Sequence, residues 1–137
     1  MKFIKYLFII VILNSCKAQT NLETMVINYK AATRGSSINF KVTSSKLYYK
    51  DIEKTIEKKT TSKVWQEITT IVELINLSEI ENFNPPTSDR NVDAALYATL
   101  SITIGNLIYE SQTFDHGNPP EELKPLIETL FNVLDLE

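Results

Sequence analysis

The chain has 137 residues, which suits one domain built around one modest hydrophobic core. Apolar residues make up 43% of it, as in a globular rather than a disordered protein. The formal net charge of -3 argues against a nucleic-acid partner, because such proteins usually present a basic surface.

The first fifteen residues are typical of a bacterial export signal. Lys2 and Lys5 precede a short apolar run at residues 6–13, which is too short to span a membrane as a retained helix. The run ends in Leu13-Asn14-Ser15-Cys16, which resembles the lipobox of bacterial lipoproteins. That resemblance implies diacylglycerol on the Cys16 sulfur and cleavage before Cys16, and acyl chains of this kind anchor a protein to a bilayer. The alternative is an ordinary secretory signal with a chance cysteine.

These features predict three segments. Residues 1–15 are expected to be a lipoprotein signal peptide, residues 16–23 the lipidated cysteine and a polar tether, and residues 24–137 a single α+β domain. Cys16 is the only cysteine, so no intrachain disulfide can form and the core alone must stabilise the domain.

The first half of the domain alternates apolar and polar residues with a period of two. This predicts strands over residues 24–32, 38–42 and 47–50, with a turn at Arg34-Gly35 between the first two. The mixed-charge segment 51–60 fits either a solvated loop or an edge strand.

A helix is expected over residues 62–77, capped by Thr61 or Ser62, because apolar residues recur there at helical spacing. Trp65 lies at the edge of that apolar stripe and is expected to pack in the core. Residues 80–89 form a connection, in which Pro85-Pro86 can continue neither a helix nor a central strand.

The segment from residue 96 to about residue 114 predicts a hairpin around the two-residue loop Gly105-Asn106, with Ile104 opposite Leu107. A polar turn at residues 115–120 then leads into a terminal amphipathic helix. Pro125 is awkward inside that helix, so either residues 120–123 form a separate turn or the helix is kinked. The expected fold is an α+β domain with an antiparallel sheet of about five strands. Its order is three strands, a helix, two strands and a helix, with both helices packed on one face.

The strongest polar cluster is Asp115-His116-Gly117-Asn118, which contains the only histidine. Asp115 and His116 could act as general acid and base or bind a metal. A zinc site lacks further ligands, and an oxygen-rich site using Asp89, Asp93 and Asp115 would have no EF-hand spacing. The alternative is structural: Asp115 accepts backbone hydrogen bonds in the turn and Asn118 caps the last helix.

Arg34 is the second candidate, since an arginine in a turn can bind a carboxylate or phosphate. It could equally pair with Asp93 or Asp115 and pin the first turn to the last. Arg34, Asp93, Asp115 and His116 are therefore candidates for a binding site or a structural clasp. No nucleophile, P-loop or dinucleotide-binding motif is found in the sequence, and neither a metal nor a cofactor is expected.

Several motifs together resemble small lipoproteins of flavobacteria and other Bacteroidetes: Ala32-Thr33-Arg34-Gly35, Trp65, Asp93-Ala94-Ala95 and Phe114-Asp115-His116-Gly117-Asn118-Pro119-Pro120. The resemblance covers nearly the whole chain. In that group an Asp-Gly-Ala sequence is usual at the third motif, whereas here Asp93 runs directly into Ala94. The acidic cluster that marks surface export in that group is absent after Cys16. The resemblance therefore implies a periplasm-facing domain, anchored to the outer membrane through acylated Cys16, and it implies no activity.

The function expected from the sequence is a non-enzymatic binding or scaffolding module of the cell envelope, with a possible envelope protein as partner and no nucleic acid. One alternative is a small hydrolase-like or metal-assisted enzyme that uses Asp115 and His116, with or without Arg34. Another is an inhibitor of an envelope enzyme that presents the segment 51–60 as a loop.

Overall fold

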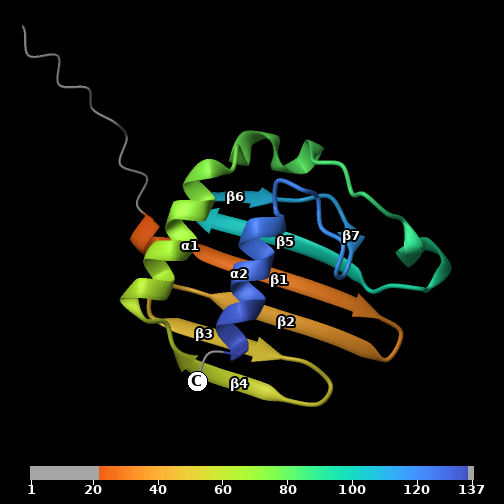
Figure 1. The fold of residues 1–137 in the computed structure, drawn as a ribbon, viewed down its shortest axis with the longest axis horizontal. Coiled ribbons are helices and arrows are strands. Elements are labelled where there is room, and N and C mark those ends of the chain that lie inside the picture. The colour runs from red at the N-terminus through yellow and green to blue at the C-terminus, as the bar shows by residue number, and fades with distance from the viewer. Residues whose placement is uncertain (1–21, 136–137) are drawn as a thin grey trace, which may run out of the picture.

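The computed structural model describes residues 22–135, and the expected signal peptide and Cys16 lie outside this range. Within it, the chain forms an α+β fold with one antiparallel sheet and two main helices (Figure 1). The strands are β1 (Val26–Thr33), β2 (Ser36–Val42), β3 (Lys46–Lys50), β4 (Thr55–Lys59), β5 (Tyr97–Ile104), β6 (Leu107–Glu110) and β7 (Phe114–Asp115). The helices are α1 (Ser62–Leu74) and α2 (Lys124–Asp135), and the 3₁₀ turns are η1 (Leu22–Thr24), η2 (Leu77–Asn82) and η3 (Asp89–Val92).

The sheet has the order β4-β3-β2-β1-β5-β6, and β7 pairs with β5. β1 and β5 therefore lie at its centre, although more than sixty residues separate them in the chain. Both α1 and α2 cover the same face of the sheet (Figure 1). The opposite face, which we call the open face, carries mostly polar side chains, as expected for an antiparallel sheet with one wet side.

The core lies between the sheet and the two helices. Alternate strand residues such as Tyr29, Phe40 and Leu100 are almost completely buried, and so are Ile68 of α1 and Leu126 of α2. Trp65 is 8% exposed and belongs to this core, as the sequence predicted. No helix among residues 22–135 is long and apolar enough to cross a membrane.

The predicted strand count was too low. The described residues form seven strands rather than about five, because the segment 51–60 supplies β4 and the predicted returning strand is split in two. β4 is an edge strand, which was one of the two alternatives for this segment. The hairpin register is as predicted: Ile104 lies opposite Leu107, and Gly105 has a φ of +59°.

The returning strand is split because it contains one extra residue. The Ser111 N–H donates to the Leu100 carbonyl, whereas Phe114 lies opposite Ala98. Two residues between Ser111 and Phe114 therefore face the single residue between Ala98 and Leu100, which is the arrangement of a β-bulge. The Ser111 hydroxyl also accepts a hydrogen bond from the Leu100 N–H at 3.0 Å. The bulge ends β6 at Glu110 and shifts the alternation of everything after it.

One helix boundary differs from the expected one, and the other follows one of the two alternatives that the sequence left open. The first helix ends at Leu74 rather than at residue 77, because the chain turns into η2 there. The last helix begins only at Lys124, after a separate turn in which the Leu123 and Lys124 N–H groups donate to the Pro120 carbonyl. Pro125 therefore lies in the first turn of α2, where its missing N–H costs little.

Candidate functional site

Asp115 and His116 are neighbours in sequence but point in opposite directions. Residues of an extended strand alternate between the two faces of a sheet. Because of the bulge, Phe114 enters the core and Asp115 points to the other side of the strand. His116 then turns back to the helix side, where it contacts Tyr29 of β1. An acid–base pair between these two neighbours is therefore not assembled.

The Asp115 carboxylate is completely buried and holds the η3 segment in place. One oxygen accepts from the Thr87 hydroxyl at 2.5 Å and from the Asp89 N–H at 2.7 Å. The other accepts from the Arg90 N–H at 3.0 Å and from the Arg90 guanidinium at 2.9 Å. Burial alone would raise the pKa of Asp115, but these hydrogen bonds outweigh it and hold the pKa well below its usual range. Asp115 thus remains ionised and fully paired, and we call its contacts with Thr87, Asp89 and Arg90 the clasp.

The expected pairing of Arg34 with Asp93 or Asp115 is wrong. Arg34 is exposed in the turn between β1 and β2 and makes no hydrogen bond or ion pair with another described residue. The partner of Asp115 is Arg90, whose guanidinium also donates to the Thr87 carbonyl at 2.8 Å. Arg90 reaches this carboxylate because η3 packs against β7.

Asp93 ends η3 through its backbone. Its φ is +56°, the only positive value at a non-glycine position in the described residues, and its N–H donates to the carbonyl of Arg90. Aspartate tolerates this left-handed conformation better than most residues do. Asp93 therefore makes the turn that ends η3.

Asn118 does not cap the last helix, because α2 begins six residues later. Its N–H instead donates to the Asp115 carbonyl at 2.9 Å and closes a tight turn. Gly117 lies in that turn with a φ of +91°, a conformation that a side chain would strain.

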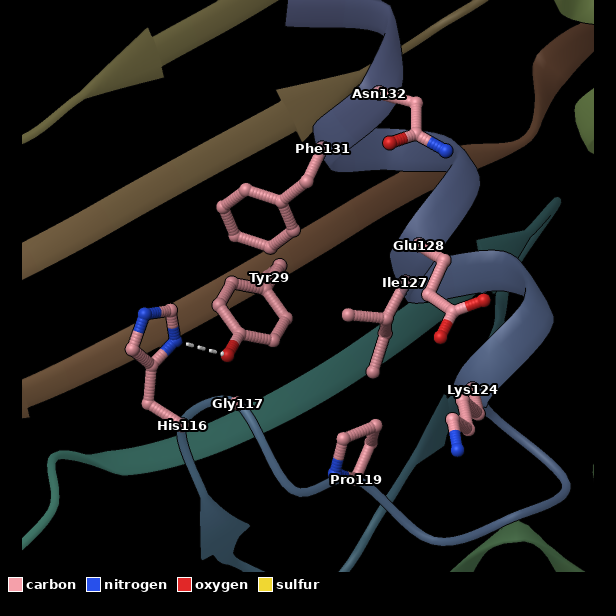
Figure 2. A pocket seen from close by; sticks show the side chains of 9 residues that line it. All are labelled: Tyr29, His116, Gly117, Pro119, Lys124, Ile127, Glu128, Phe131 and Asn132. Atoms are coloured by element: carbon pink, nitrogen blue, oxygen red, sulfur yellow. Dashed lines mark hydrogen bonds between the residues drawn. The ribbon is translucent and has the colours of Figure 1, made fainter.

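His116 is joined to Tyr29 by a hydrogen bond of 2.6 Å between the tyrosine hydroxyl and Nδ1. Burial lowers the pKa of His116 and raises that of Tyr29, so both groups are neutral near pH 7. We assign the hydroxyl as donor and Nδ1 as acceptor, which places the imidazole proton on Nε2. Nε2 has no hydrogen-bond partner among the described residues, and it points away from Tyr29 (Figure 2).

The Tyr29–His116 pair lines a pocket of about 350 Å³ between the 116–119 turn and α2 (Figure 2). Its apolar surface comes from Tyr29, Pro119, Ile127 and Phe131. Phe131 meets the Tyr29 ring edge-on at a centroid distance of 5.2 Å. Tyr29 and Phe131 therefore pack against each other in the wall of the pocket.

The rim of the pocket is polar. Lys124, Glu128 and Asn132 lie on successive turns of α2, and His116 lies across from them (Figure 2). An apolar pocket with a few polar groups at its mouth is the usual build of a small-ligand site, and this volume is at the small end of that class.

The described residues contain no group of three or more histidine, cysteine, aspartate or glutamate side chains that could hold a metal ion. Asp89 and Asp93 are exposed, and the oxygens of Asp115 are occupied by protein donors. The oxygen-rich site considered from the sequence is therefore not assembled around Asp115.

Sequence reasoning missed three of the residues that form this region. Arg90 was not a candidate, because Arg34 lies beside a glycine in a clearer turn sequence. Tyr29 and Phe131 looked like ordinary core positions of a strand and a helix. The local signal was the sequence Thr87-Ser88-Asp89-Arg90, which has the polar residues of a turn that can bind a carboxylate.

No model of a known protein family matches this chain, and no curated protein is significantly similar to it.

Proposed function

We propose that this protein is a lipid-anchored lipoprotein of the cell envelope whose domain binds a ligand rather than catalysing a reaction. The ligand inserts one apolar group, the size of an aromatic ring or a branched aliphatic side chain, into the pocket beside Tyr29. The observation that carries this proposal is the pocket itself, an apolar hollow with a donor or acceptor on each side of its mouth.

Binding is favoured over catalysis by the directions of the polar groups. A hydrolase would need an activated nucleophile or water beside His116. Asp115 points away from His116, and Arg34 does not line the pocket. His116 is instead fixed by Tyr29, so it is suited to position a ligand through Nε2.

The segment 51–60 gives no support to the proposal of an inhibitor with a presented loop. Its second half is paired to β3, and the Lys58 amine donates to the Val133 carbonyl of α2 at 2.7 Å. Residues 55–59 therefore belong to the packed sheet, and the short turn before them is exposed.

The pocket is tested by NMR with small probes. Indole, p-cresol and 1-hexanol are titrated into the ¹⁵N-labelled protein in detergent. We expect shifts at the amides of His116, Gly117 and residues 127–131. Glu128→Trp places a large ring at the mouth and should abolish these shifts, whereas Glu67→Trp, an equally exposed change on α1, should not. Shifts that are scattered over the domain, or that persist in Glu128→Trp, would refute the pocket as a binding site.

The lipid anchor is tested separately. A bacterium that expresses the full chain is fed an alkyne-tagged fatty acid, and the purified protein is examined for label and mass. We expect label on the wild type, loss of residues 1–15, and no label on Cys16→Ser. An unlabelled wild type, or a labelled Cys16→Ser variant, would exclude acylation at Cys16.

A further inference from the structure

The open face of the sheet carries a cluster of lysines, although the chain as a whole is acidic. Residues that alternate with the buried ones on β1 to β4 must point to this face. They include one lysine on each of β1 and β2 and three more on β3 and β4. The five are Lys30, Lys41, Lys46, Lys50 and Lys59. All five are exposed.

The register places these lysines close together. Lys46 lies directly opposite Lys59, and Lys30 and Lys50 lie on the two sides of Asn39. Like charges directly opposite one another destabilise a sheet. Among the described strand residues of this face there are three acids: Glu57, which forms an ion pair with Lys46, Glu110 on the far edge strand β6, and Asp115 of β7, which is buried and paired with Arg90. An anion on this face would relieve the repulsion between the lysines.

The other side of the molecule has the opposite charge. α1, η2 and α2 together carry six acidic residues and two lysines: Glu67, Glu73, Glu79, Glu81, Glu128 and Asp135 against Lys63 and Lys124. η3, which carries Asp89 and Arg90 and is followed by Asp93, does not belong to this side: it packs against Asp115 beyond Tyr97, away from the lysine-bearing strands. The domain is therefore electrically two-sided, with its cationic half on the sheet from β1 to β4.

We propose that this open face docks onto an anionic lipid bilayer. The lysines spread over three strand spacings, about 14 Å, which suits many weak contacts with a flat surface better than one buried ligand. Tyr48 lies among them, opposite Lys41 and Glu57, and tyrosine is common where a protein meets lipid headgroups.

The length of the chain before the domain agrees with this arrangement. Here the inference rests on the proposed acyl anchor: Cys16 precedes Leu22 by six residues, which can span at most about 21 Å. A domain on so short a connection stays at the bilayer surface. With the open face against the lipid, the acidic helical side faces away from the membrane and the pocket beside α2 stays accessible.

The experiment measures lysine reactivity in the full chain. The protein is reconstituted into two kinds of vesicle that differ only in their lipids. One kind is pure phosphatidylcholine, and the other is phosphatidylcholine with about 40% phosphatidylglycerol, which is anionic. Acetylation by an amine-reactive ester is then followed by mass spectrometry. We expect Lys30, Lys41, Lys50 and Lys59 to react severalfold more slowly in the anionic vesicles, and Lys63 on α1 to react equally in both. Added salt should remove the protection, because exposed charges are screened within a Debye length.

Two variants with the same change in net charge provide the matched control. Lys41→Glu should abolish the protection of the remaining open-face lysines, whereas Lys63→Glu should preserve it. Each juxtamembrane lysine contributes on the order of a fivefold change in surface affinity, so reversing one charge should weaken docking roughly thirtyfold.

The outcomes separate this inference from the proposed anchor. Protein that is retained by both kinds of vesicle but shows equal lysine reactivity in the two would overturn the docking. Protection in native membranes alone, without protection in anionic vesicles, would also overturn it and would indicate an acidic protein as the occupant. If neutral vesicles fail to retain the protein while anionic ones retain it with protected lysines, the anchor is wrong and the docking stands.

Discussion

The hydrogen bond between Tyr29 and His116 can be tested by removing a single oxygen atom. Tyr29→Phe keeps the ring that packs against Phe131 at 5.2 Å and against Phe114 at 6.1 Å. It removes only the hydroxyl that donates to Nδ1 at 2.6 Å. The substitution therefore isolates the polar contact from the core packing around it.

The expected loss is that of one hydrogen bond between a buried group and a half-buried one, a net destabilisation of about 1 kcal/mol. For a domain of this size, that corresponds to a decrease in melting temperature of about 4 °C. Urea unfolding should show a lower midpoint with an unchanged slope. Tyr97→Phe is the matched control, because that hydroxyl has no hydrogen-bond partner among the described residues, and it should change stability by less than about 0.5 kcal/mol.

In a double-mutant cycle of Tyr29→Phe and His116→Gln, the coupling free energy between the two positions should account for most of the destabilisation by Tyr29→Phe. Equal stability of Tyr29→Phe and wild type, or additive effects in the cycle, would show that the hydrogen bond does not stabilise the domain. The pocket would then lack the fixed imidazole on which the proposed binding depends.

Three further predictions follow from the same region. Asp115→Asn should lower the melting temperature more than Tyr29→Phe does, because it leaves the Arg90 guanidinium and two backbone N–H groups facing a neutral amide; an equal or smaller effect in calorimetry would contradict the clasp. Burial lowers the pKa of His116 from its usual 6.5, so the unfolded chain takes up this proton first and stability should fall as the pH drops below about 6.5. Urea midpoints between pH 7.5 and 5 should show this decrease, and His116→Gln should reduce it. Asp93→Gly should be neutral or stabilising at a φ of +56°, whereas Asp93→Val should be destabilising; the reverse order of melting temperatures would contradict the assigned turn.

Much of the fold was predictable because the apolar pattern repeats with clear periods. The alternation in β1, β2, β3 and β5 and the stripe of α1 all identified the correct kind of element. The glycine at position 105 fixed the hairpin register, since a two-residue loop allows only one pairing of its flanking strands. β4 was ambiguous because an edge strand can be as charged as a loop.

The clasp was not predictable, because it depends on the β-bulge after Ser111, and no residue type in that segment indicates a bulge. In a regular strand that continues from Ser111 with strict alternation, Phe114 would point to the open face and Asp115 to the core. The sequence alone therefore gave no reason to choose Arg90 over Arg34 as the partner of Asp115. Both arginines follow polar turn residues, and only the path of the chain from η3 to β7 distinguishes them.

The bulge also explains how a structural clasp at Asp115 and a ligand pocket at His116 can use two consecutive residues. Phe114 and His116 face the helices, and Asp115 between them faces η3. A change at Asp115 should therefore reach the pocket only through the backbone that carries His116, whereas a change at Tyr29 should reach it directly. If probe binding is weakened by Tyr29→Phe at a temperature where both variants are folded, and is preserved in Asp115→Asn, the two sides of this strand have separate roles. Equal loss in both variants would mean instead that the turn acts as one unit, and that the position of His116 depends on the clasp as much as on its own hydrogen bond.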